Sequence, residues 1–205
     1  NNGAGSDGTG SGGGAYLDNS NLVGQKAIIH YNTAPDYGGG LAAYNGSFID
    51  LDLGDYPCQT TRCSKISYNT VTNVYGGGIY ASNSLVYLDH TFVENNTANY
   101  GGGIYVYQGN LTINNTVFAR NNATDNFMGD AVRLFDTASM TGSGNTLAYN
   151  DYGGAETGVG ITTYSSSLDL DCSIVWGHAT SIDTPGLDIT YSDVQGGYTG
   201  TGNLN

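Results

Sequence analysis

Carboxylates at alternate positions are the first residues in this sequence that could do chemistry. Asp50, Asp52 and Asp55 lie in the segment FIDLDLGDY, and Asp169 and Asp171 lie in SLDLDC. Residues two apart on a strand point to the same face, so each pair could hydrolyse a polysaccharide by acid–base catalysis or bind Ca²⁺. Alternating Leu and Asp is equally typical of any half-buried strand. We therefore assign no catalytic, cofactor-binding or metal-binding residue. If these carboxylates bind an ion, we expect it to be Ca²⁺.

Basic and histidine side chains do not complete a catalytic set. A lyase that acts on uronates needs an Arg or Lys base beside Asp-bound calcium, but the basic residues here are scattered along the chain. They are Lys26, Arg62, Lys65, Arg120 and Arg133. Arg120 follows Glu94 by 26 residues, which predicts an exposed ion pair between successive repeats. The histidines, His30, His90 and His178, lack metal-ligand spacing, and we expect the first two to be exposed on strands.

Three cysteines lie in two different environments. Cys58 and Cys63 are in the polar segment DYPCQTTRCS, where a disulfide between them would close a loop; two unpaired thiols are the alternative. Cys172 lies in the apolar run DCSIVW, which predicts a small buried core residue.

Tyrosines recur beside glycine runs. Tyr37, Tyr75, Tyr100 and Tyr152 precede such runs, whereas Tyr80 and Tyr105 follow two of them. If successive repeats stack, Tyr37, Tyr75, Tyr80, Tyr100 and Tyr105 form an aromatic stripe. Aromatic surfaces pack against sugars or other proteins. The alternative is that tyrosine is simply a good strand residue with a polar tip.

Five Asn-x-Ser/Thr sequons are candidate glycosylation sites, although chance alone accounts for their number. They begin at Asn45, Asn95, Asn110, Asn114 and Asn122. We expect them on turns, which would suit glycans.

A repeat of about 26 residues determines which elements position these side chains. The segments YGGGIYASNSLVYLDHTFVENNTAN (75–99) and YGGGIYVYQGNLTINNTVFARNNATDN (100–126) align without gaps, and weaker copies extend the count to about seven units. Each unit holds three short stretches of period-2 apolar character and no helical stretch. So small a unit cannot bury its own apolar face, so we expect an all-β, single-stranded parallel β-helix, or β-solenoid, of about seven coils.

Stacked coils place equivalent residues in columns about 4.8 Å apart. We expect two inward apolar columns, one of Leu22, Leu85, Leu111 and Met140 and one of Ile29, Ile66, Phe92, Phe118 and Leu147. A third column contains Asn32, Asn69, Asn95, Asn121 and Asn150. Asn tolerates the left-handed backbone of a corner, and stacked amides can bond along the column. Glycine triplets let neighbouring coils approach closely; a phosphate-binding loop would need a helix after them, and none is predicted.

The pairing of Gly-Gly-Gly-Ile with Phe-x-x-Asn, at 76–79 with 92–95 and at 101–104 with 118–121, resembles the repeats of polymorphic outer-membrane proteins, which are autotransporter-like adhesins. The tail SIVWG followed by LDITYSDVQGGY is similar to the closing coils of secreted right-handed parallel β-helix proteins. The resemblance implies a right-handed solenoid over residues 12–205. An insertion of about 12 residues in one repeat predicts a protruding loop around 50–64, and residues 1–11 read as a flexible leader or an inter-subunit segment.

Charge excludes several partners. Five basic against 18 acidic residues give a net charge of −13, which would repel nucleic acid. No apolar run approaches the ~20 residues that span a bilayer, so we expect no membrane span. Acidic, Lys-poor chains are common outside the cell, which favours an extracellular or cell-surface location.

Neither end of the sequence supplies an evident cap for a solenoid. Either the sequence is an excerpt of a longer solenoid, or the open ends of neighbouring copies pair, and we expect such self-association. The leading hypothesis is an extracellular structural or adhesive protein that stacks head to tail into a filament or surface fibre. The alternative is a β-helix that binds or cleaves polysaccharide. We favour a protein that is not an enzyme and leave activity open.

Overall fold

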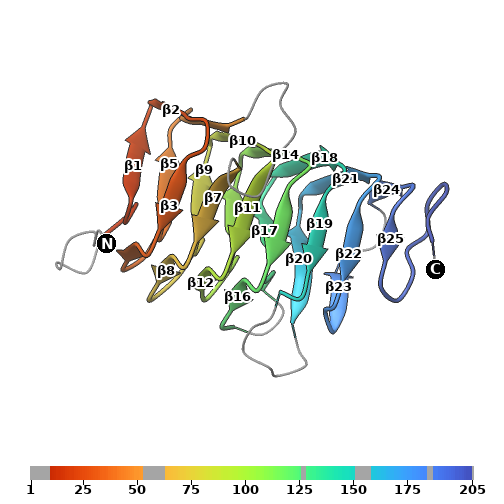
Figure 1. Ribbon diagram of the computed structural model, residues 1–205. Helices are drawn as coiled ribbons and strands as arrows, with labels where there is room; N and C mark the ends of the chain where they lie inside the picture. Colours follow the sequence, from red (N-terminus) through yellow and green to blue (C-terminus); the bar gives the residue numbers. More distant parts are fainter. Residues whose placement is uncertain (1–9, 53–62, 126–127, 151–157, 184–186, 205) are drawn as a thin grey trace.

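The computed structural model describes residues 10–52, 63–125, 128–150, 158–183 and 187–204. Every regular element in these ranges is a β-strand, and all strand pairs are parallel. The strands form three seven-stranded sheets and one four-stranded sheet, and they wind around a common axis (Figure 1). Neighbouring strands in a sheet come from successive coils, which is the arrangement of a parallel β-helix. The predicted fold class is therefore confirmed.

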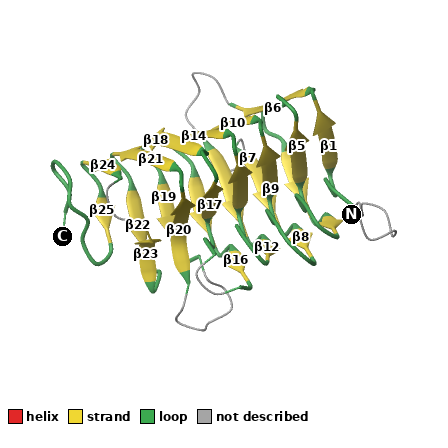
Figure 2. Ribbon diagram, turned by 180° about the vertical axis from the view of Figure 1, so that it is seen from behind, coloured by secondary structure: helices red, strands yellow, loops and turns green. Residues whose placement is uncertain are grey.

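Each coil passes through the sheets in a fixed order, and the view from behind shows the same stacking (Figure 2). The first sheet contains β1 (Ala15–Asp18), β5 (Leu41–Tyr44), β9 (Ile79–Ser82), β13 (Ile104–Tyr107), β17 (Val132–Phe135), β20 (Val159–Tyr164) and β23 (Thr180–Asp183). The second contains β2 (Asn21–Val23), β6 (Phe48–Leu51), β10 (Leu85–Asp89), β14 (Asn110–Asn114), β18 (Ser139–Ser143), β21 (Ser167–Asp171) and β24 (Asp188–Thr190).

The third and fourth sheets complete the coil. The third contains β3 (Ile28–His30), β7 (Ser64–Ser67), β11 (Thr91–Glu94), β15 (Val117–Ala119), β19 (Thr146–Ala148), β22 (Ile174–Trp176) and β25 (Asp193–Val194). A short sheet of two-residue strands follows it in four coils: β4 (Thr33–Ala34), β8 (Thr70–Val71), β12 (Thr97–Ala98) and β16 (Asn122–Ala123). No helix in the described part of the chain is long and apolar enough to cross a membrane.

The main core is one continuous apolar cluster inside the solenoid, and a small second cluster contains Ala34, Val71 and Ala98 of the short sheet. The main core corrects two predicted columns. Val86, not Leu85, pairs with Leu111, and Leu85 is 47% exposed. Val93, not Phe92, pairs with Phe118. The reason is the length of this coil, because the paired residues are 25 positions apart in the sequence and not 26. An alignment by 26 shifts the strand by one residue, which turns each side chain to the opposite face. The other members of both predicted columns do lie in register.

A buried asparagine column forms the corner between the third sheet and the short sheet. It contains Asn32, Asn69, Asn96, Asn121 and Asn150, so Asn96 replaces the predicted Asn95. Each amide oxygen accepts from the backbone N–H and the side-chain Nδ2 of the preceding member, as in Asn69 to Asn96 at 3.0 Å for both bonds. The Nδ2 of Asn69 also donates to the carbonyl of Ile29 at 2.9 Å. The column thereby satisfies buried backbone groups that the bend removes from the sheets.

The glycine triplets allow close packing of coils. A Cβ on Gly77, the middle residue of its triplet, would lie 2.3 Å from the carbonyl oxygen of Gly102 in the next coil. Gly76 before it has a φ of 70°, which favours glycine. The predicted role of the triplets in close approach is therefore confirmed. The predicted insertion falls mostly on residues 53–62, and the leader mostly on residues 1–9, which lie outside the described residues.

Candidate functional site

The predicted carboxylate pairs lie on the outer side of the second sheet but do not meet. Asp50 on β6 and Asp169 on β21 belong to one column, with Tyr87, Thr112 and Thr141 between them. Four coil steps of ~4.8 Å separate Asp50 from Asp169 by about 19 Å, so the two pairs do not combine into one site. Within a strand, residues two apart lie about 6.6–6.8 Å apart, which is inside the 5–9.5 Å range of glycosidase carboxylates. Burial raises the pKa of Asp50, with a smaller contribution from Asp52.

The remaining predicted acids have other neighbours. Asp171 accepts hydrogen bonds from the thiol of Cys172 at 3.3 Å and from the hydroxyl of Thr190 at 3.0 Å. Asp55 lies outside the described residues. Within the described ranges, no group of three or more His, Cys, Asp or Glu side chains could hold a metal ion.

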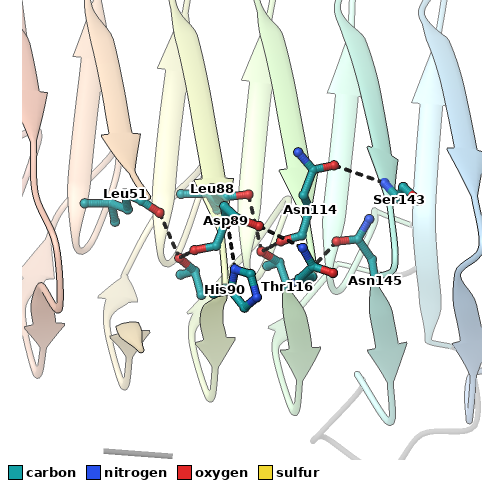
Figure 3. A network of polar contacts seen from close by, with 10 residues as sticks. Leu51, Leu88, Asp89, His90, Asn114, Thr116, Ser143 and Asn145 are labelled. Atoms are coloured by element: carbon teal, nitrogen blue, oxygen red, sulfur yellow. Dashed lines mark hydrogen bonds and ion pairs between the residues drawn. The ribbon is translucent and has the colours of Figure 1, made fainter. Parts of the chain in front are cut away.

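An Asp–His pair that the sequence analysis did not predict lies at the end of β10 (Figure 3). The buried carboxylate of Asp89 contacts Nδ1 of His90 at 2.6 Å and accepts from Nδ2 of Asn115 at 3.0 Å. His90 therefore follows the strand at a turn, with a φ of 47°, and is not an exposed strand residue. Such a pair can orient an imidazole. In the neighbouring bonds, the backbone N–H of Ser143 donates to Oδ1 of Asn114, and that of Thr116 donates to Oδ1 of Asn145. These bonds tie side chains to the backbone of an adjacent coil, so the network is structural along its length.

The other two histidines differ in burial. His30 is exposed on β3, as expected. His178 is buried and continues the asparagine column: its Nε2 lies 3.2 Å from Nδ2 of Asn150. Burial lowers the pKa of His178 to about 4, so the ring is neutral at physiological pH.

The predicted ion pair between Glu94 and Arg120 is wrong. Glu94 pairs in register with Ala119 and forms its ion pair with Lys65 of the preceding coil. Arg120 lies one residue further along, in the corner after β15, with a φ of 54°. The same 25-residue coil that shifts the apolar columns causes this error.

Cys172 is exposed, which contradicts the predicted core position. It follows β21 at a corner with a φ of 48°, so its side chain points outward. A hydrogen bond to Asp171 raises the pKa of the Cys172 thiol. Cys63 is buried and disulfide-bonded, which excludes a free thiol there, whereas its predicted partner Cys58 lies outside the described residues.

The sequons lie on strand ends and corners. Asn45 and Asn110 are exposed, and Asn114 and Asn122 are half-buried. Asn95 is also half-buried, and its Nδ2, the atom that a glycan would modify, is inaccessible to solvent. Asn45 therefore presents its amide better than Asn95, although its Nδ2 donates to Asp18 at 2.7 Å.

The structure brings the predicted tyrosines together on the outer side of the first sheet. Tyr37, Tyr75 and Tyr100 form consecutive parallel bridges between coils. Their rings lie over Tyr80 and Tyr105, with centroids 4.8 Å apart for Tyr37–Tyr80 and 4.4 Å apart for Tyr75–Tyr105. Burial raises the pKa of Tyr80 to about 12 and that of Tyr105 further. Tyr152 lies outside the described residues.

Further aromatic residues extend this surface, and the sequence analysis missed them. Phe135 stacks on Tyr164 at 4.9 Å and on Tyr107 at 6.2 Å, and Tyr16 contacts Tyr44 at 5.3 Å. Four of these residues share a signal, because each is the last residue of its strand: Tyr44, Tyr107, Phe135 and Tyr164. We call the whole set the aromatic face: Tyr16, Tyr37, Tyr44, Tyr75, Tyr80, Tyr100, Tyr105, Tyr107, Phe135 and Tyr164.

One cation belongs to the aromatic face. The guanidinium carbon of Arg133 lies 5.7 Å from the centroid of the Phe135 ring, and its Nη1 donates to Thr162 at 2.9 Å. These contacts hold the side chain flat against the sheet. The face thus combines ring edges, phenol hydroxyls and one fixed guanidinium.

Comparison with known proteins agrees with the geometry. Residues 58–193, more than half of the chain, match the model of a family described as "Right handed beta helix region". Neither a curated protein nor a solved structure matches the chain. The match bears on the fold and on its handedness; it specifies no ligand and no reaction.

Proposed function

Because the chain belongs to the right-handed β-helix family, we propose that it is a non-catalytic binding protein at or outside the cell surface, whose aromatic face recognises polysaccharide. The fold is compatible with adhesive and with polysaccharide-active proteins alike. The observation that carries the proposal is the continuity of the aromatic face, where ring contacts link Tyr16 to Tyr105 and Tyr107 to Tyr164 along one sheet.

The chemistry of the aromatic face suits a sugar polymer. Tyrosine offers an apolar ring for the C–H groups of a sugar and a hydroxyl for its polar groups. Tyr16 and Tyr164 are 56% and 59% exposed, so these groups are accessible at both ends of the stack. Tyr80 and Tyr105 are buried and serve as the base on which Tyr37 and Tyr75 pack. The rings repeat at the coil spacing of ~4.8 Å, so a polymer along the axis would make several weak contacts at once.

Two further features support binding rather than catalysis. In the predicted pair Asp169/Asp171, the carboxylate of Asp171 is already hydrogen-bonded to Cys172 and Thr190. Asp50 and Asp169 are too far apart to form a catalytic pair across the sheet. The resemblance of the Gly-Gly-Gly-Ile repeats to those of polymorphic outer-membrane proteins also supports an adhesive role at a cell surface.

Affinity electrophoresis in gels that contain xylan, mixed-linkage β-glucan or galactomannan tests this proposal. We expect at least one neutral polymer to retard the protein, and the double variant Tyr107→Ala/Tyr164→Ala to weaken that retardation about fivefold or more. Tyr191→Ala is the matched control, because Tyr191 is 62% exposed but lies outside the aromatic face. Equal mobility in all gels, or release of reducing ends from a polymer, would overturn the proposal.

Head-to-tail assembly is a second candidate function, and the first coil favours it. Within the described residues, β1, β2 and β3 have a strand neighbour on one side only. Val23 and Ile28 there are 71% and 67% exposed, and Leu22 and Ile29 line an open cavity of about 360 Å³. Unpaired edges with apolar side chains favour pairing with another strand edge. We propose that the last coil of a second copy packs there.

Electron microscopy and sedimentation velocity of the purified chain test this assembly. We expect concentration-dependent linear particles from the wild type and single particles from Val23→Asp/Ile28→Asp. Leu85→Asp is the control, since Leu85 is exposed in the middle of the solenoid. A wild type that stays monomeric at all concentrations would exclude the second candidate and leave the first intact.

A further inference from the structure

A groove lies at the corner between the third sheet and the short sheet, on a different sheet from the aromatic face. Its volume is about 630 Å³, which is within the range of small-molecule sites, about 300–1,000 Å³. We call it the corner groove. Its lining comes from four successive coils: Tyr31, Tyr68, Thr70, Asn95, Thr97 and Arg120.

The groove is built on one repeated position, the residue directly before each buried asparagine. Tyr31, Tyr68, Asn95, Arg120 and Tyr149 occupy this position with φ between 51° and 54°, and the first four of them line the groove. Left-handed backbone favours Gly or Asn, and a bulky residue there costs about 1–3 kcal/mol. Tyr31, Tyr68 and Arg120 are therefore not at these positions because they favour the turn, and we infer that their side chains have another role.

Because equivalent positions of successive coils stack, the side chains at this position enclose a gap, with an aromatic wall at Tyr68 and a cationic wall at Arg120. The rings of Tyr31 and Tyr68 stack at 4.9 Å with planes 11° apart. The opposite side of the Tyr68 ring faces the next coil, where the short side chain of Asn95 leaves space. Arg120 follows one coil later, so Tyr68 and Arg120 bound a gap of two coil steps, about 10 Å between their backbones.

The cation in this gap, Arg120, has no side-chain partner among the residues that the structure describes. Arg120 is exposed and makes no ion pair or side-chain hydrogen bond with the described part of the chain. The previous coil contains an acid near this position, Glu94, but Glu94 forms its ion pair with Lys65. Thr70 and Thr97 line the groove with hydroxyls, and Nδ2 of Asn95 has no hydrogen-bond partner.

We propose that the corner groove binds a sugar unit that carries a carboxylate, with its ring against Tyr68 and its carboxylate on Arg120. A guanidinium matches a carboxylate with two parallel hydrogen bonds, and the threonine hydroxyls match those of a sugar. The net charge of −13 repels a long polyanion, so the anionic unit is an isolated or terminal one on an otherwise neutral glycan. This site extends the proposed binding function but does not depend on the aromatic face.

Titration followed by NMR tests the site with a matched pair of probes. Methyl β-glucuronide and methyl β-glucoside share a ring and differ only in the carboxylate. We expect the wild type to prefer the glucuronide, and Arg120→Gln to weaken its binding about tenfold or more and abolish the preference. Arg120→Lys should retain part of the preference because it keeps the charge but loses the planar fork. The methyl glycoside of N-acetylneuraminic acid distinguishes the source: tighter binding than the glucuronide assigns a nonulosonic acid, and weaker binding a uronic acid.

Two controls separate this site from other effects. Lys26→Gln removes the same charge at another exposed position of positive φ, and it should leave glucuronide binding unchanged. Tyr68→Ala should weaken both probes, whereas Tyr107→Ala/Tyr164→Ala should weaken neither, so loss of the proposed polymer binding and loss of this site give different results. Equal binding of the two probes by the wild type, an unchanged preference in Arg120→Gln, or an equal loss in Lys26→Gln would overturn the proposal.

Discussion

At the scale of single residues, the corners of this molecule depend on amides with a full set of partners. Asn96 is fully buried, and its side chain donates to Asn121 and to the carbonyl of Ile66 while it accepts from Asn69. Its neighbour Asn95 is half-buried and belongs to the surface groove. Two adjacent asparagines thus have opposite roles.

This difference predicts unequal effects of alanine at the two positions. Asn96→Ala removes the acceptor of the backbone N–H and of one Nδ2 hydrogen of Asn69 and the donor to the carbonyl of Ile66. We therefore expect a loss of about 2–4 kcal/mol in the free energy of unfolding. Asn95→Ala should change it by less than about 1 kcal/mol. Chemical denaturation followed by circular dichroism measures both. Similar losses for the two variants would contradict the assignment of Asn96 to the column.

His178 predicts a pH dependence of stability. Its pKa is about 4 in the folded chain and about 6.5 when unfolded, so between these values the unfolded state binds more protons. Stability is therefore highest above pH 6.5 and falls as the pH decreases to 4, by about 3 kcal/mol from this group. His178→Asn keeps an amide in the column and removes the titration. The difference in unfolding free energy between wild type and His178→Asn should shrink by that amount from pH 7 to 4; a constant difference would contradict the prediction.

The roles of single residues were harder to predict from the sequence than the strands or the fold. In the pair Asn95-Asn96 either residue fits the repeat, and only the 25-residue length of that coil selects the second. The corner groove was missed for the same reason, because a column that contains Asn95 places Glu94 between Tyr68 and Arg120 and pairs it with Arg120, whereas the column with Asn96 places the short side chain of Asn95 there. The tyrosines beside the glycine runs were easier to predict, since the runs themselves fix the register.

At the scale of elements, the long strands were predicted from the sequence and the short ones were not. Period-2 apolar patterns predicted three strands per coil, and the three seven-stranded sheets agree with this number. The short sheet was not predicted, because a two-residue strand such as Thr70–Val71 is too brief to show any periodicity.

Glycine substitution tests the element level. Gly77→Ala places a Cβ against the backbone of the next coil, so we expect a loss of about 3 kcal/mol or more in unfolding free energy. In Gly24→Ala the new Cβ meets side chains at 3.5 Å, an ordinary contact, and the change should be small or slightly stabilising. Thermal unfolding of the two variants checks this. Equal melting temperatures would show that the coils can separate at Gly77 without cost.

At the scale of the whole molecule, charge opposes association. A net charge of −13 makes two copies repel each other at low salt, although the exposed apolar side chains of the first coil favour contact. Only the sequence composition was needed to anticipate the repulsion, whereas the exposure of Val23 and Ile28 required the structure.

The proposed assembly should therefore depend on salt. Between 20 mM and 500 mM NaCl the Debye length falls from about 20 Å to about 4 Å, so we expect larger sedimentation coefficients at high salt. Val23→Asp/Ile28→Asp should stay monomeric at both concentrations. If the wild type dissociates at high salt instead, ion pairs rather than apolar contacts join the copies.

The asparagine column also has a direction. From Asn32 to Asn150 every side chain donates toward the C-terminal coil and accepts from the N-terminal side, and the last donor meets the ring nitrogen of His178. Amide dipoles so oriented add along the axis and polarise one another. When His178 takes up a proton, that final acceptor becomes a donor and faces the backbone N–H and Nδ2 of Asn150, which are donors themselves. The amides are not free to turn over in response, because Oδ1 of Asn150 accepts from a backbone N–H and its Nδ2 also donates to a backbone carbonyl. A proton at this coil therefore opposes the whole row at its last member.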